Sequence, residues 1–239
     1  MPSDRTQSLT LVFAHGWAMG DWFWEPLATQ FADYELHFCS RGYFEQGAEP
    51  CSSSQGPTFS AGLLPEATSW VGIGHSFGFR RLLEADLINC RGLVSICGFR
   101  DFVADEGTDP RIVKAMVRRM RSSPETVLEQ FLENCGVAEG VESARAVLGN
   151  PTRERGLQGE DLNLKLLEVD LKALLKIGQD VESNVPILSL AASHDKIVPA
   201  TLTRSEFEQP LFHPSAGHGL GFQHSDWCAS HIQEFLKTL

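Results

Sequence analysis

Ser76 is the first candidate for chemistry in this sequence, because glycines stand two residues before it and two residues after it. An apolar run precedes this segment at residues 69–73, and a helix-like run follows it at residues 79–85. A strand, a G-x-S-x-G turn and a helix, in that order, expose a serine hydroxyl as a nucleophile. Glycine fits the two flanking positions because the tight turn leaves little room for side chains. The same motif also arises by chance in glycine-containing loops, and this chain has 21 glycines.

A serine nucleophile needs a base that takes its proton and an acid that orients the base. Asp195 follows an apolar run at residues 186–191, and His218 lies between two glycines just before the last helix-like segment. In a parallel sheet, the loops that follow the strands gather at the carboxyl edge, beside the serine turn. We therefore predict a catalytic triad of Ser76, His218 and Asp195, with His218 as general base and then acid.

Other residues of the same types leave alternatives open. Asp195 could instead cap a turn or a helix, and His218 could be a surface histidine. We expect His75 to line the pocket rather than act as the base, because its side chain points away from that of its neighbour Ser76. The remaining candidates have weaker settings: His194, expected to be exposed, His213 and His224 as bases, and Asp105 as a reserve acid.

The oxyanion of an acyl-transfer intermediate needs two fixed backbone donors. In the context of a G-x-S-x-G turn, these are the N–H of the residue after the nucleophile and an N–H from the loop after an earlier strand. The first is that of Phe77. The second is expected in His15-Gly16-Trp17, from the Trp17 backbone. The alternative is a tight strand exit with Trp17 in the core, and the Trp17 backbone could donate while its indole packs.

Short apolar segments alternate with helix-like segments, which predicts a parallel sheet with helices on both faces. The sequence therefore predicts an α/β protein. The predicted strands are residues 9–14, 35–39, 69–73, 92–97, 186–191 and 211–212, and the predicted helices outside the insertion include 24–31, 79–85 and 226–236. Residues 101–182 show helical periodicity without strands. We expect residues 1–100 and 183–239 to form the core and residues 101–182 to form an inserted helical lid.

The composition is that of one soluble globular domain, with 239 residues, 42% of them hydrophobic and 21% charged. The net charge of −11 argues against a general nucleic-acid or anionic-membrane surface. The first residues lack the pattern of a signal peptide, and no apolar run is long enough to cross a bilayer. The six cysteines show no metal-binding spacing, and Cys90 and Cys97 are expected to be buried free thiols beside a strand. We expect a cytoplasmic monomer without metal or cofactor.

Four motifs together resemble the α/β-hydrolase superfamily: residues 11–17, 74–78, 195–199 and 216–218. Within it, Trp22 and residues 127–132 and 166–171 are similar to the carboxylesterases of biotin synthesis that demethylate pimeloyl-carrier-protein methyl ester. The resemblance implies an α/β-hydrolase fold and a serine esterase acting on an acyl methyl ester. Two departures concern the pocket wall: residues 40–44 replace the usual acidic turn, and Phe79 stands where a small residue is common.

Three other functions stay open. One is a generic small-ester hydrolase. Another is a carbon–carbon bond hydrolase of the same fold, which would favour a cation deep in the pocket, with Arg100 as the nearby candidate. The third is a ligand receptor that uses the fold without catalysis.

The predicted lid carries a basic stripe. Residues 111–123 contain five basic residues and no acidic one. On a helical wheel one face carries Arg111, Lys114, Arg118 and Arg121, and the other carries Val113, Met116, Val117 and Met120. An apolar face over the active site and a basic face outside would suit an acyl chain delivered by an acidic acyl carrier protein. Arg145, Arg153 and Arg155 could extend the stripe. An ordinary solvated amphipathic helix would show the same pattern.

Overall fold

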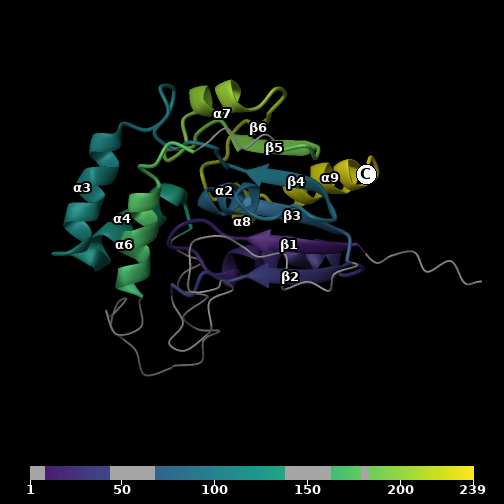
Figure 1. Ribbon diagram of the computed structural model, residues 1–239, viewed down its shortest axis with the longest axis horizontal. Helices are drawn as coiled ribbons and strands as arrows, with labels where there is room; N and C mark the ends of the chain where they lie inside the picture. The colour runs from purple at the N-terminus through teal and green to yellow at the C-terminus, as the bar shows by residue number, and fades with distance from the viewer. Residues whose placement is uncertain (1–8, 44–67, 138–162, 179–182) are drawn as a thin grey trace, which may run out of the picture.

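The computed structural model describes residues 9–43, 68–137, 163–178 and 183–239 (Figure 1). Six strands form one sheet in the order β2-β1-β3-β4-β5-β6, and all neighbouring strands pair in parallel. The strands are β1 (Thr10–Ala14), β2 (Glu35–Cys39), β3 (Trp70–His75), β4 (Cys90–Ile96), β5 (Ile187–Ala192) and β6 (Leu211–His213). Each lies where the sequence predicted a strand, and the parallel sheet of the α/β-hydrolase fold is confirmed.

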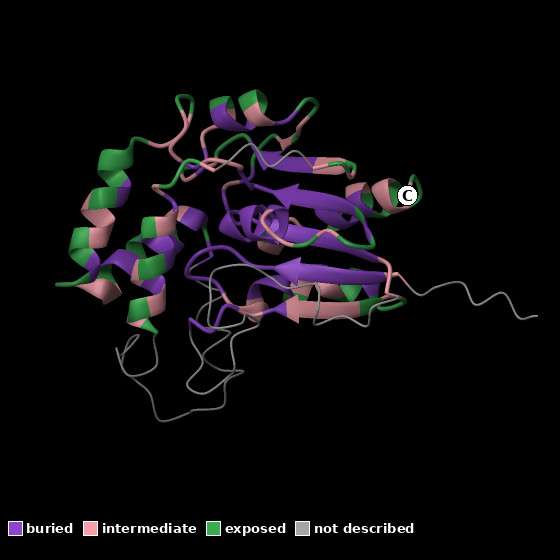
Figure 2. Ribbon diagram, viewed as in Figure 1, coloured by how far each residue is buried: buried purple, intermediate pink, exposed green. Residues whose placement is uncertain are grey.

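Helices cover both faces of the sheet, which explains why β1, β3 and β4 are almost entirely buried (Figure 2). Residues of β1 alternate between two apolar clusters, with Leu11 and Phe13 in one and Val12 in the other. The first cluster includes side chains of α1 (Glu25–Ala28), α8 (Leu220–Gln223) and α9 (Ser225–Leu236). The second includes side chains of α2 (Phe77–Leu83). Another helix, α7 (Ala200–Glu206), lies between β5 and β6 in the chain.

The predicted helix-like segment at residues 24–31 is helical and consists of three short elements in direct succession. These are the 3₁₀ helix η1 (Asp21–Trp24), α1, and the 3₁₀ helix η2 (Thr29–Phe31). Within this segment Trp24, Leu27 and Phe31 are all buried in the first cluster, together with Phe23 just before it. The prediction of a helix-like segment is therefore confirmed, with the helical geometry changing between 3₁₀ and α along it.

Three helices lie together beyond the end of the sheet toward which the strand arrows point (Figure 1). We call α3 (Pro110–Met120), α4 (Pro124–Cys135) and α6 (Leu164–Ala173) the cap helices. Local signals set their ends: Asp109 accepts a hydrogen bond from the Arg111 N–H, and Gly136 ends α4 in the left-handed conformation. Among the described residues between 101 and 182 there is no strand, as predicted.

Five cysteines in the described ranges are free and buried, among them Cys90 at the start of β4 and Cys97 just after it. Burial raises the pKa of Cys90 to about 11 and that of Cys228 to about 12, so these thiols stay protonated at neutral pH.

None of the helices in the part of the chain that the structure describes has the length and apolarity needed to span a bilayer.

Candidate active site

Ser76 lies in the turn between β3 and α2 with a backbone φ of 53° and ψ of −124°. A positive φ is unfavourable for a residue with a side chain, so the surrounding packing must hold the turn. The flanking glycines allow that packing. A Cβ at Gly74 would overlap the Phe79 backbone, and a Cβ at Gly78 would overlap the Ala14 carbonyl group. The turn therefore presents Ser76 at the carboxyl edge of the sheet.

The structure brings Ser76, His218 and Asp195 into one chain of hydrogen bonds. The Ser76 hydroxyl and His218 Nε2 are 3.0 Å apart, and His218 Nδ1 and Asp195 Oδ2 are 2.8 Å apart. A carboxylate accepts, so Nδ1–H donates to Asp195 and Nε2 is left to accept from the serine hydroxyl. His218 is fully buried. This is the geometry that serine activation requires.

Asp195 also caps a turn, which is the role that the alternative interpretation gave it. Its Oδ1 accepts hydrogen bonds from the backbone N–H groups of Ile197, at 2.7 Å, and Val198, at 2.9 Å. The other oxygen, Oδ2, is thereby directed at the imidazole of His218. One oxygen of the Asp195 carboxylate therefore caps the turn, and the other orients the imidazole of His218.

The loop after β1 lies against the serine turn. A Cβ at Gly16 would come within 2.8 Å of His75 Nδ1 and 3.0 Å of Ser76 Cβ, so no larger residue fits there without a shift. The next residue, Trp17, is buried and lines the same cavity as Ser76 and Phe77. The backbone of this loop therefore runs beside the nucleophile.

His75 does not line the pocket, which corrects that expectation. It is fully buried, its ring stacks on Phe23 with centroids 4.2 Å apart, and its Nε2 is 2.9 Å from the carbonyl oxygen of His218. Burial lowers the pKa of His75 well below its ordinary value. A neutral ring can donate Nε2–H to that carbonyl, so His75 supports the backbone of His218.

The other reserve residues do not line the cavity that contains Ser76. His194 and Asp105 are exposed. His213 stacks on His224 with ring centroids 4.1 Å apart, and neither lines the cavity. Arg100 lines a separate groove beside β5 and α7, where its backbone N–H donates to Glu206. The cation that a carbon–carbon bond hydrolase would favour is therefore not supplied by Arg100.

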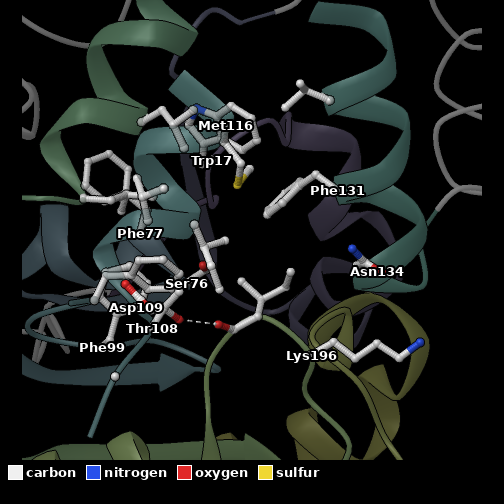
Figure 3. Close-up of a pocket in the computed structure, with 18 of the residues that line it drawn as sticks. Trp17, Ser76, Phe77, Phe99, Thr108, Asp109, Met116, Phe131, Asn134 and Lys196 are labelled. Carbon is white, nitrogen blue, oxygen red and sulfur yellow. Dashed lines mark hydrogen bonds between the residues drawn. The ribbon is translucent and has the colours of Figure 1, made fainter. Parts of the chain in front are cut away.

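A cavity of about 500 Å³ opens above Ser76 (Figure 3). The side chains of Trp17, Met116 and Phe131, from the loop after β1, α3 and α4, face this space. Trp17 and Phe131 pack edge to face with centroids 4.8 Å apart. The size suits a small organic ligand. The lining is mainly apolar, and its polar or charged members are Ser76, Thr108, Asp109, Arg119, Gln130, Asn134 and Lys196.

The apolar face of α3 is partly as predicted. Val113 and Met116 line the cavity, whereas Val117 and Met120 pack elsewhere in the first apolar cluster. Sequence reasoning missed Ile112 and Arg119 as lining residues. Their spacing of seven residues, about two helical turns, is the signal that could have placed them together.

The predicted basic stripe divides into two parts. Arg111, Lys114 and Arg118 are exposed. Arg121 is also exposed, but it is paired with Glu168 of α6 at 2.8 Å, and Glu168 also binds Lys172. Its charge is partly neutralised within the cap helices. Arg145 and the pair Arg153 and Arg155 lie outside the described residues.

Cys97 lies beside the acid and the base. A ligand atom from each of Cys97, Asp195 and His218 falls within 4.8 Å of the others, the only such group found in the described ranges. Burial raises the pKa of the Cys97 thiol, and nearby Asp195 raises it further. A metal would need a free imidazole nitrogen, and both ring nitrogens of His218 already have partners. The group fits proton transfer better than metal binding.

Comparison with known proteins gives relatives in sequence and in structure. Two pimeloyl-[acyl-carrier protein] methyl ester esterases, from Stenotrophomonas maltophilia strains K279a and R551-3, are each 28% identical, over 96% of this chain and 93% of theirs. An esterase from Exiguobacterium antarcticum has a TM-score of 0.74 at 14% identity, covering 97% of this chain and 92% of its own. A hydrolase from Oleispira antarctica has a TM-score of 0.75 at 11% identity, with the same coverage. No family model matches the chain.

The chain has the α/β-hydrolase fold, and the relatives in sequence and structure that it resembles are esterases and hydrolases. The curated relatives are named for one activity, the hydrolysis of pimeloyl-[acyl-carrier protein] methyl ester.

Proposed function

We propose that this protein is a serine carboxylesterase whose substrate is an acyl methyl ester on a carrier protein, pimeloyl-[acyl-carrier protein] methyl ester in biotin synthesis. The observation that carries the proposal is the hydrogen-bonded chain from Asp195 through His218 to Ser76, which opens into the apolar cavity. The names of the two curated relatives support the choice of substrate.

The reaction follows from the proton positions. His218 Nε2 takes the proton of Ser76 as Oγ attacks the ester carbonyl carbon, and Asp195 stabilises the imidazolium that forms. The backbone N–H groups of Trp17 and Phe77 would bind the oxyanion of the tetrahedral intermediate. His218 then protonates the departing methoxide, which leaves as methanol. Water attacks the acyl-enzyme with the same base, and the free carboxylate leaves.

Charge and shape support an acyl chain held by a carrier. The cavity is mainly apolar, and the cap helices would form the lid over it. Exposed Arg111, Lys114 and Arg118 on α3 would face the acidic surface of a carrier protein. We assign the same role to Arg121 and Arg145, with a smaller contribution from Arg121 because Glu168 already pairs with it.

The test compares two substrates and one nucleophile variant. The wild-type protein should release methanol from pimeloyl-[acyl-carrier protein] methyl ester with a higher kcat/KM than from a free short-chain methyl ester. A fluorophosphonate probe should label Ser76 in the wild type and nothing in Ser76→Ala. Loss of the catalytic serine should lower kcat by about 10⁶-fold. Labelling elsewhere, or an active Ser76→Ala, would refute the proposed mechanism.

The substrate assignment has its own negative result. Equal kcat/KM on the carrier-borne and the free ester would indicate a generic small-ester hydrolase. A bacterium that lacks its own demethylating esterase and requires biotin gives a second test. Growth without biotin should be restored by the wild-type gene and not by the Ser76→Ala gene.

A further inference from the structure

The loop that carries the proposed oxyanion donor is tied to α6 of the cap. The indole N–H of Trp17 donates to the carbonyl oxygen of Leu167 in α6, at 2.9 Å, across 150 positions of sequence. Trp17 and Leu167 are both buried. The orientation of the Trp17 residue therefore depends on where this helix lies.

One turn further along α6, Asp170 is fully buried and ion-paired with Arg41 from the loop after β2. Arg41 Nε donates to Asp170 Oδ2 at 2.7 Å, and Arg41 Nη2 donates to Oδ1 at 2.8 Å. The Tyr43 hydroxyl donates to Oδ2 at 2.6 Å. The backbone carbonyl of Tyr43 also accepts from the N–H of Asn163, just before α6. A two-pronged ion pair of this kind fixes both position and orientation.

The backbone of Arg41 is hydrogen-bonded to the loop after β1. Its N–H donates to His15 Nε2 at 3.0 Å, so the proton of the ring is on Nδ1, which donates to the Gly16 carbonyl at 2.9 Å. Burial lowers the pKa of His15 to about 3, and the ring stays neutral in this tautomer. Gly16 is the residue that lies against Ser76.

These contacts connect residues 15–17, the loop after β2 and α6 in a closed ring. It runs from Trp17 to Leu167, along α6 to Asp170, through Arg41 to His15, and back through Gly16. We propose that Asp170 and Arg41 are positioning residues for the oxyanion donor, acting through α6 and His15. According to this proposal, α6 helps to hold the oxyanion donor in its catalytic position. The inference rests on the proposed function, because it assigns the task of the Trp17 backbone.

The experiment measures kcat and KM on a short-chain p-nitrophenyl ester, and the inhibition constant of a trifluoromethyl ketone. Ser76 Oγ adds to the ketone carbon and its proton passes to His218, so the resulting oxyanion needs the same donors as the reaction. Asp170→Asn should lower kcat about 10²-fold, as loss of one oxyanion donor does, with KM unchanged. Affinity for the ketone should fall by the same factor as kcat.

Two milder variants keep the test decisive if Asp170→Asn does not fold. Tyr43→Phe removes one hydrogen bond to Asp170 and leaves the ion pair. Trp17→Phe removes the indole donor and also shrinks a ring that lines the cavity. Each should lower kcat and ketone affinity together, and KM should stay unchanged in Tyr43→Phe. Their combined loss should be smaller than the product of the single losses, because both act through α6.

Glu168→Gln is the matched control. It lies on α6 beside Leu167, and its ion pairs with Arg121 and Lys172 are on the surface. Its kcat and ketone affinity should match those of the wild type. Folded Asp170→Asn with wild-type kcat, or wild-type values in both Tyr43→Phe and Trp17→Phe, would overturn the inference. So would a fall in kcat without a fall in ketone affinity. An active Ser76→Ala would instead refute the proposed function, so the two failures are distinct.

Discussion

Two of the cap helices, α6 and α3, border the same cavity and are held in different ways. α6 is anchored by buried polar contacts to the core, the Asp170–Arg41 ion pair and the Trp17–Leu167 hydrogen bond. α3 buries only Val113 and Met120 and carries its charges on the outside. A helix fixed by a buried ion pair has one position, whereas a helix held by an apolar stripe tolerates changes on its outer face. On the proposed function, α6 would serve the chemistry and α3 would contact the carrier of the substrate.

The strongest test of this difference between α6 and α3 is to remove the buried carboxylate of Asp170. Asp170→Ala leaves the Arg41 guanidinium buried without its charged partner, which should lower the free energy of unfolding by about 3–5 kcal/mol. Lys114→Ala on the exposed face of α3 should change it by less than about 0.5 kcal/mol. Urea unfolding followed by circular dichroism gives both values. Similar losses in the two variants would show that the helices are held alike.

Acid should destabilise the protein through His15 and His75, which are both buried. Burial lowers the pKa of His15 from 6.5 to about 3 and lowers that of His75 well below 6.5. Below the unfolded pKa the unfolded chain binds protons that the folded chain does not, so this stability is complete above about pH 6.5 and is lost as pH falls. Well below pH 6.5 the two rings together should contribute a slope that approaches about 2.7 kcal/mol per pH unit, and near pH 6.5 the slope should be about half of that.

Urea unfolding at several pH values between about 5 and about 7 measures this slope, in a range where most carboxylates stay ionised. The α3 helix carries only exposed ionisable groups, so it adds no comparable term. A free energy of unfolding that stays constant over that range would mean that the rings take up protons in the folded state.

Charge reversal on α3 should separate the two substrates. Arg111→Glu combined with Arg118→Glu should lower kcat/KM on the carrier-borne ester by about tenfold, because both side chains are exposed to an acidic partner. Turnover of a free short-chain ester should not change. Arg121→Glu serves as a contrast, since Arg121 already pairs with Glu168. Equal losses on both substrates would point to damage to the cap helices.

The smallest expected effect concerns the cavity wall. Met116→Leu in α3 conserves volume and should change stability by less than about 1.5 kcal/mol. It should shift the preference for acyl chain length, because Met116 lines the cavity. A series of p-nitrophenyl esters of increasing chain length measures that preference. An unchanged profile would mean that this part of α3 does not contact the acyl chain.

The sequence by itself determined the strands, their parallel pairing and the three side chains that meet at the carboxyl edge. These were predictable because each depends on a local signal. Ser76 lies between two glycines after an apolar run, and Asp195 and His218 follow later strands. In a parallel sheet, residues that follow strands necessarily come together at one edge. The segment at residues 24–31 is helical as predicted, but its division into 3₁₀ and α turns followed from no local pattern.

Only the tertiary structure decided the contacts that tie α6 to the loop after β1. Arg41 appeared in the sequence as a departure from the usual turn, and Asp170 as part of a short similar segment. Their ion pair spans 129 positions, and no local period predicts which buried face of α6 meets which loop. The same holds for Trp17 and Leu167. Local patterns specify where elements begin and which face is apolar, but a buried pair between distant segments exists only once the packing has set their distance and orientation.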